Sequence, residues 1–117
     1  MAEVKTWSDD ENRVTVEAYL NMLAAQLRGE RIVKSPVYAE IAAEIGRTPK
    51  AVEWNFQNIS SALQELDVPW VSGLPPQKNR QVSLIDEVER QFEGSALEEA
   101  VRRFLLDPPP AARADME

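Results

Sequence analysis

Two apolar patterns separated by a three-residue turn constrain the fold of this chain most strongly. The first pattern, with a four-residue spacing, consists of Val37, Ile41 and Ile45. Gly46 follows, and glycine readily adopts the left-handed conformation that ends many helices. The second pattern, with alternating four- and three-residue steps, consists of Val52, Phe56, Ile59, Leu63 and Leu66. Both spacings are those of one helix face, so we expect helices at 36–46 and 49–66 in the layout of a helix-turn-helix.

Residues at the start of each segment support this division. Ser35 is expected to cap the first helix, with Pro36 at the first helical position, where its missing N–H does no harm. Thr48 and Pro49 repeat the arrangement at the start of the second helix. The motif does not by itself establish DNA binding, because the same helical corner also occurs as plain scaffold.

A further helix is expected before this pair. Ser8 and Glu11 have the spacing of a capping box, in which each side chain binds the other residue's backbone N–H. This helix should end near Leu27, since Gly29 follows, and a short extended link at 30–34 leads into the helix-turn-helix. Its buried face is expected to consist of Val16, Leu20, Leu23 and Leu27.

Two more helices are expected after the pair. The loop 67–79 contains three prolines and one glycine, which mark irregular structure. A helix at about 80–92 follows, then a break at Gly94 and Ser95, and then a helix at 96–106. The side of the first of these helices that faces the core is expected to consist of Val82, Ile85, either Val88 or Glu89, and Phe92.

These segments account for nearly the whole chain. No strand pattern and no internal repeat is present, so we expect an all-α fold of about five helices that includes a helix-turn-helix. Residues 7–106 should form this single domain. Residues 107–117, which begin with an aspartate and three prolines, are expected to be a linker or tail.

The composition restricts the chemistry. The 117 residues include neither cysteine nor histidine, so a disulfide framework and a finger-type zinc site are excluded, and no metal or cofactor is expected. The longest apolar runs are far shorter than the roughly 20 residues of a membrane span, and no signal peptide is evident. A cytoplasmic bacterial protein without a membrane partner is therefore expected.

The charge is unevenly distributed along the chain. A net charge of −7 does not fit a protein that coats DNA non-specifically. Residues 28–80 nevertheless carry seven basic and six acidic side chains, whereas the flanking segments together carry a net charge of −8. This pattern fits a weak or conditional DNA contact, or one module of a larger protein.

The face of the second helix opposite its apolar stripe is the one that a recognition helix would present. At 100° per residue, that face consists of Lys50, Trp54, Gln57 and Ser61. Lys50 suits a phosphate contact, and Gln57 or Asn55 could bind the edge of an adenine. A second phosphate contact could come from Lys78 and Arg80, beside Asn79, which is expected to cap the helix at 80–92.

Trp54 admits three interpretations. The loop 67–79 or the fourth helix could pack over it. Alternatively, its ring could stack on a base or act as a wedge in nucleic acid. It could also anchor a protein interface. We expect partial burial with one ring edge exposed.

Several short motifs carry a resemblance to a known family. They are Gly46-Arg47-Thr48, Ala51-Val52-Glu53, Gln57-Asn58-Ile59-Ser60-x-Ala62-Leu63, Pro69-Trp70-Val71-x-Gly73 and Pro76-x-x-Asn79-x-Gln81, together with Trp7 and Met22-Leu23. Over residues 7–90 the chain resembles the small helical domain at the N-terminus of many bacterial HNH-type nucleases. These nucleases include McrA-like, modification-dependent restriction enzymes and related defence proteins.

The resemblance implies a role in restriction or defence. In that family the domain precedes a modified-base reader and an HNH catalytic domain, and it is taken to assist DNA engagement. This chain departs from the pattern at Asn55, where the family has a basic residue. It also has no histidine, which the HNH motif requires, so a nuclease domain would have to be supplied by a downstream part of a longer protein.

The sequence does not indicate an enzyme. Without histidine or cysteine, catalysis would depend on carboxylates, lysine, serine or tyrosine. Asp9, Asp10 and Glu11 are better explained as first-turn acids that stabilise a helix N-terminus. Two of the remaining acids, Asp86 and Glu87, belong to a solvated helix face. We therefore expect no catalytic residues.

Two functions from different classes remain. The first is a DNA-binding accessory module of a restriction or defence protein, with plain or modified duplex DNA as its partner. Its candidate contact residues are Arg47, Thr48, Lys50, Trp54, Asn55, Gln57, Asn58, Ser61, Lys78 and Arg80. The second is a protein-interaction or dimerisation module in which the acidic flanks and Trp54 meet another protein. An acidic mimic of DNA is less compatible, because the acids gather at helix N-termini.

Overall fold

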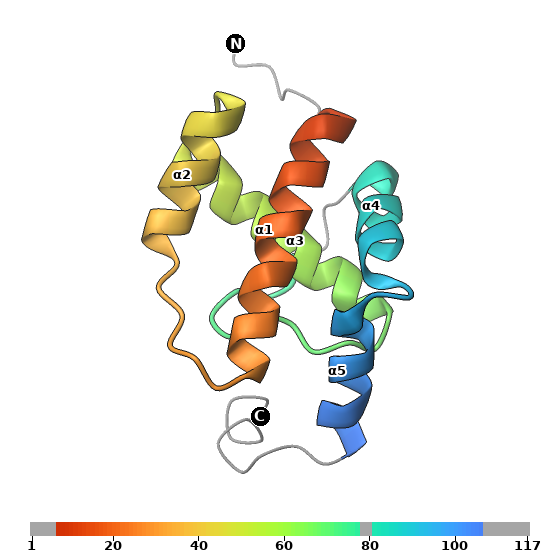
Figure 1. Ribbon diagram of the computed structural model, residues 1–117. Helices are drawn as coiled ribbons and strands as arrows, with labels where there is room; N and C mark the ends of the chain where they lie inside the picture. Colours follow the sequence, from red (N-terminus) through yellow and green to blue (C-terminus); the bar gives the residue numbers. More distant parts are fainter. Residues whose placement is uncertain (1–6, 78–80, 107–117) are drawn as a thin grey trace.

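The computed structural model describes residues 7–77 and 81–106, and in these residues it consists of five α-helices and no strand (Figure 1). The helices are α1 (Asp9–Leu27), α2 (Ser35–Ile45), α3 (Pro49–Glu65), α4 (Val82–Phe92) and α5 (Ala96–Leu106). The predicted all-α fold is confirmed. The predicted tail at 107–117 lies outside the described residues, and no helix within them is long and apolar enough to cross a bilayer.

The helix α1 is central to the arrangement. It packs against each of the other four helices, whereas α2 and α5 have no comparable contact with one another. In Figure 1, α2 lies on one side of α1, α4 and α5 lie on the other side, and α3 crosses behind it. The helix α1 therefore packs against both helices of the helix-turn-helix, α2 and α3.

The start of α1 is held by the predicted capping box. The Oγ of Ser8 accepts a hydrogen bond from the backbone N–H of Glu11 at 3.1 Å, and Glu11 Oε1 accepts one from the backbone N–H of Ser8 at 2.9 Å. The helix ends at Leu27, and Gly29 follows with φ +80°. Both boundaries agree with the prediction.

The start of α2 differs from the prediction. Ser35 is the first residue of the helix and not its cap, because Lys34 precedes it with helical angles (φ −83°, ψ −37°) and no side-chain capping bond. The carbonyl of Lys34 accepts the first helical hydrogen bond, from Tyr38 N–H at 3.1 Å. Pro36 still lies in the first turn, where no partner for its nitrogen is needed. The helix ends as predicted, at Gly46 with φ +74°.

The cap of α3 is confirmed. Thr48 has extended backbone angles, and its Oγ1 accepts a hydrogen bond from the backbone N–H of Ala51 at 3.1 Å. The helix then runs to Glu65, and Leu66 is its C-cap.

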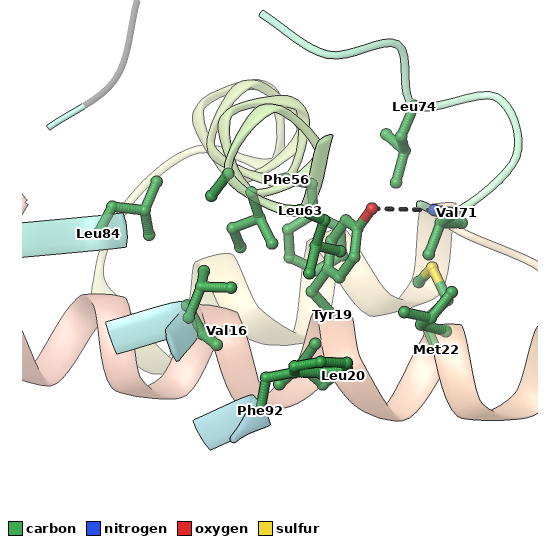
Figure 2. Close-up of a cluster of buried hydrophobic side chains, with 14 of the residues drawn as sticks. Val16, Tyr19, Leu20, Met22, Phe56, Leu63, Val71, Leu74, Leu84 and Phe92 are labelled. Atoms are coloured by element: carbon green, nitrogen blue, oxygen red, sulfur yellow. Dashed lines mark hydrogen bonds between the residues drawn. The ribbon is translucent and has the colours of Figure 1, made fainter. Parts of the chain in front are cut away.

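The apolar stripe of α3 lies at the centre of the hydrophobic core (Figure 2). Its fully buried members are Val52, Phe56, Ile59 and Leu63. The ring of Phe56 meets Tyr19 of α1 and Tyr38 of α2 edge to face, each with ring centroids 5.4 Å apart. This aromatic cluster joins the three helices, so the predicted core of the helix-turn-helix is confirmed.

The edge of the core differs slightly from the prediction. On α2, Tyr38, Ile41 and Ala42 are buried, whereas Val37 and Ile45 lie partly buried at the margin. On α1, three of the four expected residues are buried and Leu27 is partly exposed.

The loop after α3 is fastened to the core by Tyr19. The hydroxyl of Tyr19 lies 2.7 Å from Ser60 Oγ and accepts a hydrogen bond from Val71 N–H at 2.9 Å (dashed line in Figure 2). Val71 and Leu74 are buried beside it. Gln26 adds a second attachment, because its Oε1 accepts a hydrogen bond from Ser72 N–H at 2.8 Å.

The helices α4 and α5 complete the domain. The N-cap of α4 is Gln81, so the helix begins about two residues later than predicted, and Asn79, the expected cap, lies outside the described residues. Val82 was expected on the buried side but is 72% exposed, because the buried face of α4 runs through Leu84, Val88 and Phe92. The bounds of α5 agree with the prediction.

Candidate nucleic-acid interface

The exposed face of α3 begins at its first turn. Lys50 and Trp54 are both exposed, and Gln57 and Asn58 are half-buried one turn further on. Because residues four apart lie on the same side of a helix, Lys50 and Trp54 are neighbours on this surface. Four of the ten predicted contact residues therefore share one face.

Trp54 is exposed. Its exposed fraction is 58%, so the interpretation that the loop or α4 packs over it is wrong, and the side chain is more exposed than the expected partial burial with one free ring edge. Both remaining interpretations, a stacking residue and a protein-interface anchor, need a ring that a partner can reach. The exposed fraction is compatible with either.

A hollow of about 270 Å³ lies beside the indole. It is lined by Trp54, Gln57, Asn58 and Gln77. The backbone N–H of Gln77 donates to the carbonyl of Gln57 at 3.2 Å, which fixes the loop against α3. Gln77 was not among the predicted site residues, because no local pattern in the proline-rich loop indicates that it returns to α3.

Lys50 takes part in a surface ion pair. Its Nζ lies 3.4 Å from Glu53 Oε1, and the Lys50 side chain is 68% exposed. Such exposed pairs contribute about 0–1 kcal/mol to stability. A phosphate could therefore replace Glu53 as the partner of Lys50 at little cost.

Asn55 and Ser61 are not on the surface. Their exposed fractions are 3% and 4%, so the prediction that they contact DNA is wrong for this conformation. The reason is that α3 packs against α1, α2 and α4, and the loop that contains Gln77 also lies against it. A helix covered from several directions buries residues beyond its apolar stripe.

Arg47 is held inside the protein. Its Nε and Nη2 donate to the two carboxylate oxygens of Glu11, each at 2.9 Å, and its guanidinium lies 4.1 Å from the ring centroid of Trp7. The side chain is 13% exposed. Arg47 thus joins the turn between α2 and α3 to the start of α1, and its predicted role as a phosphate contact is not supported. Thr48 likewise uses its hydroxyl as the cap of α3.

The ion pair makes stability depend on pH. The hydrogen bonds from Arg47 lower the pKa of Glu11 from 4.5 to about 2. Because this pKa is depressed in the folded state, the stabilisation is complete above about pH 4.5 and is lost as the pH falls towards 2. We expect Arg47→Ala to lower the free energy of unfolding by about 1–2 kcal/mol at neutral pH, since solvent reaches part of the pair.

Urea denaturation of both proteins between pH 7 and pH 2 measures this effect. The difference in stability between wild type and Arg47→Ala should shrink as the pH falls below 4.5. Arg28→Ala is the matched control, since it removes an arginine from an ion pair with Glu30 in which both side chains are exposed. A loss that is equally large at pH 2 and pH 7 would show that the Arg47–Glu11 charge interaction is not the cause.

The two remaining predicted contact residues follow Gln77 in the loop. Lys78 and Arg80 lie outside the described residues. Within residues 7–77 and 81–106, no three side chains of the metal-ligating types lie close enough together to hold a metal ion.

Comparison of the chain with protein-family models, with curated proteins and with solved structures gives no match. The resemblance to McrA-like nucleases therefore stays a prediction based on the quoted motifs.

Proposed function

We propose that this chain is a non-catalytic DNA-binding module, of the kind that precedes the reader and nuclease domains of McrA-like restriction enzymes. The observation that carries the proposal is the exposed face of α3, where Lys50 and Trp54 lie beside the amides of Gln57 and Asn58. In a helix-turn-helix the second helix is the one that lies in the major groove and contacts the base edges. A lysine for phosphate, an aromatic ring and two amides are side chains that nucleic-acid interfaces use.

The charge predicts that binding is weak and depends on salt. Each phosphate neutralised contributes about −0.9 to the slope of log affinity against log salt concentration. With a net charge of −7, this chain should bind weakly, and the slope should report how many phosphates it contacts. Such a module would contribute to DNA engagement together with other domains and not alone.

We expect Lys50→Ala to weaken duplex binding and to reduce the salt slope by about one phosphate contact. Fluorescence anisotropy with a labelled duplex between roughly 50 and 200 mM salt measures both quantities. Arg102→Ala is the matched control, because it removes the same charge from the exposed side of α5.

An equal effect of the two substitutions would mean that only net charge matters, and the proposal for α3 would be wrong. A lack of binding to plain and modified duplexes near 50 mM salt would favour the second candidate function, a protein-interaction module. The exposed Trp54 favours that candidate, since tryptophan is enriched among the residues that dominate protein interfaces. Sedimentation measurements that detect self-association, lost in Trp54→Ala, would then support it.

A further inference from the structure

We propose that the hollow beside Trp54 receives a single unpaired nucleobase. This inference rests on the proposed function and specifies its ligand: a base that is extrahelical or single-stranded. The observation behind it is the composition of the lining within the described part of the chain, which is one indole and the three carboxamide residues Gln57, Asn58 and Gln77.

The lining matches a base better than it matches a phosphate. A carboxamide offers both a hydrogen-bond donor and an acceptor, as the edge of a nucleobase does. Among residues 7–77 and 81–106, no ionised residue lines the hollow, whereas a phosphate site would need cations or a cluster of backbone N–H groups. The hollow therefore suits a neutral, planar group with polar edges.

The indole requires that the base be unpaired. A base pair within a duplex presents its edges in the grooves, but its faces are covered by the neighbouring pairs. Stacking on an aromatic side chain needs a free face, which is available in single strands, bulges and flipped nucleotides. Trp54 is exposed enough to offer its ring to such a base.

The size of the hollow is compatible with one ring system. Ligand pockets for drug-sized molecules measure roughly 300–1,000 Å³. A hollow of about 270 Å³ lies just below this range, which is large enough for one base.

The hollow is also built from two fixed elements. Trp54, Gln57 and Asn58 project from a helix whose inner face is fully buried, and Gln77 is held to that helix by its backbone hydrogen bond. Lys50 lies one turn before Trp54 on the same side of α3, where it can meet the phosphate next to the bound nucleotide.

The test compares three labelled DNAs of equal length at low salt: a perfect duplex, the same duplex with a one-nucleotide bulge, and the same bulge without its base. We expect the wild-type chain to bind the bulge that contains a base about 5- to 150-fold more tightly than the other two, as a stacked base contributes. Trp54→Ala should remove this preference without changing the melting temperature. Gln77→Ala should reduce it, and Lys50→Ala should weaken binding to all three DNAs by the same factor.

The outcomes separate this inference from the proposed function. Equal binding of the wild-type chain to all three DNAs, or a preference that survives Trp54→Ala, would overturn the base site and leave duplex binding in place. Absence of binding to any of the three would overturn both. A preference that Gln77→Ala leaves unchanged would show that the hollow does not hold the base.

Discussion

Phe56→Ala is expected to lower the free energy of unfolding by about 3–5 kcal/mol, the cost of deleting a large aromatic side chain from a well-packed core. Phe56 is fully buried and contacts both Tyr19 and Tyr38, so the deletion removes the aromatic cluster that joins α1, α2 and α3. Urea denaturation followed by circular dichroism gives the difference from the wild-type chain.

Leu106→Ala is the control for this substitution, because Leu106 is 86% exposed and should contribute little to the core. A small domain of this kind has a total stability of roughly 5–15 kcal/mol, so Phe56→Ala should lose a large share of it. If Phe56→Ala unfolds at the same urea concentration as Leu106→Ala, the helix packing described above is wrong.

Tyr19→Phe is expected to cost about 2–4 kcal/mol, because it removes one hydroxyl and leaves two buried groups without their partner. These groups are the hydroxyl of Ser60 and the backbone N–H of Val71, which fastens the loop after α3. Thermal unfolding should show a lower midpoint. Hydrogen exchange should become faster at Val71 in particular.

Tyr38→Phe provides a matched control in the same cluster. Tyr38 is also buried against Phe56, but its hydroxyl has no hydrogen-bond partner among the described residues. Removing that hydroxyl should leave stability unchanged or raise it slightly. Equal losses in Tyr19→Phe and Tyr38→Phe would contradict the role assigned to the Tyr19 hydrogen bonds.

The helices could be predicted from the sequence because their signals are local. The capping box at Ser8, the cap at Thr48 and the apolar stripe around Phe56 lie within a few residues of the features that they determine. Ser35 was wrongly predicted as the N-cap of α2 because the actual N-cap, Lys34, makes no side-chain capping hydrogen bond that the sequence could signal. Val82 was wrongly placed on the buried side because, on a short helix such as α4, more than one set of apolar residues has the helical spacing.

The candidate site could be predicted less well because its decisive contacts are distant in sequence. Arg47 and Glu11 are 36 positions apart, and no residue near Arg47 in the sequence indicates that its side chain forms this ion pair. Ser61 was assigned to the surface from helical period alone, which cannot show that α3 is covered from several sides, and Asn55 was proposed as a contact because its amide could bind an adenine edge. Gln77 lines the hollow because its loop folds back onto α3, and Tyr19 holds an earlier part of the same loop through its hydrogen bond with Val71.

Titration of the isotope-labelled chain with DNA, followed in an amide proton–nitrogen correlation spectrum, tests most directly whether the exposed face of α3 binds nucleic acid. At about 50 mM salt, the largest shifts should occur at the Trp54 indole and at the backbone and side-chain amides around Lys50, Gln57 and Asn58. The signals of α5 should stay unchanged, because it lies away from α2 and the start of α3 (Figure 1). Shifts confined to α4 and α5, or the absence of shifts anywhere, would contradict the account.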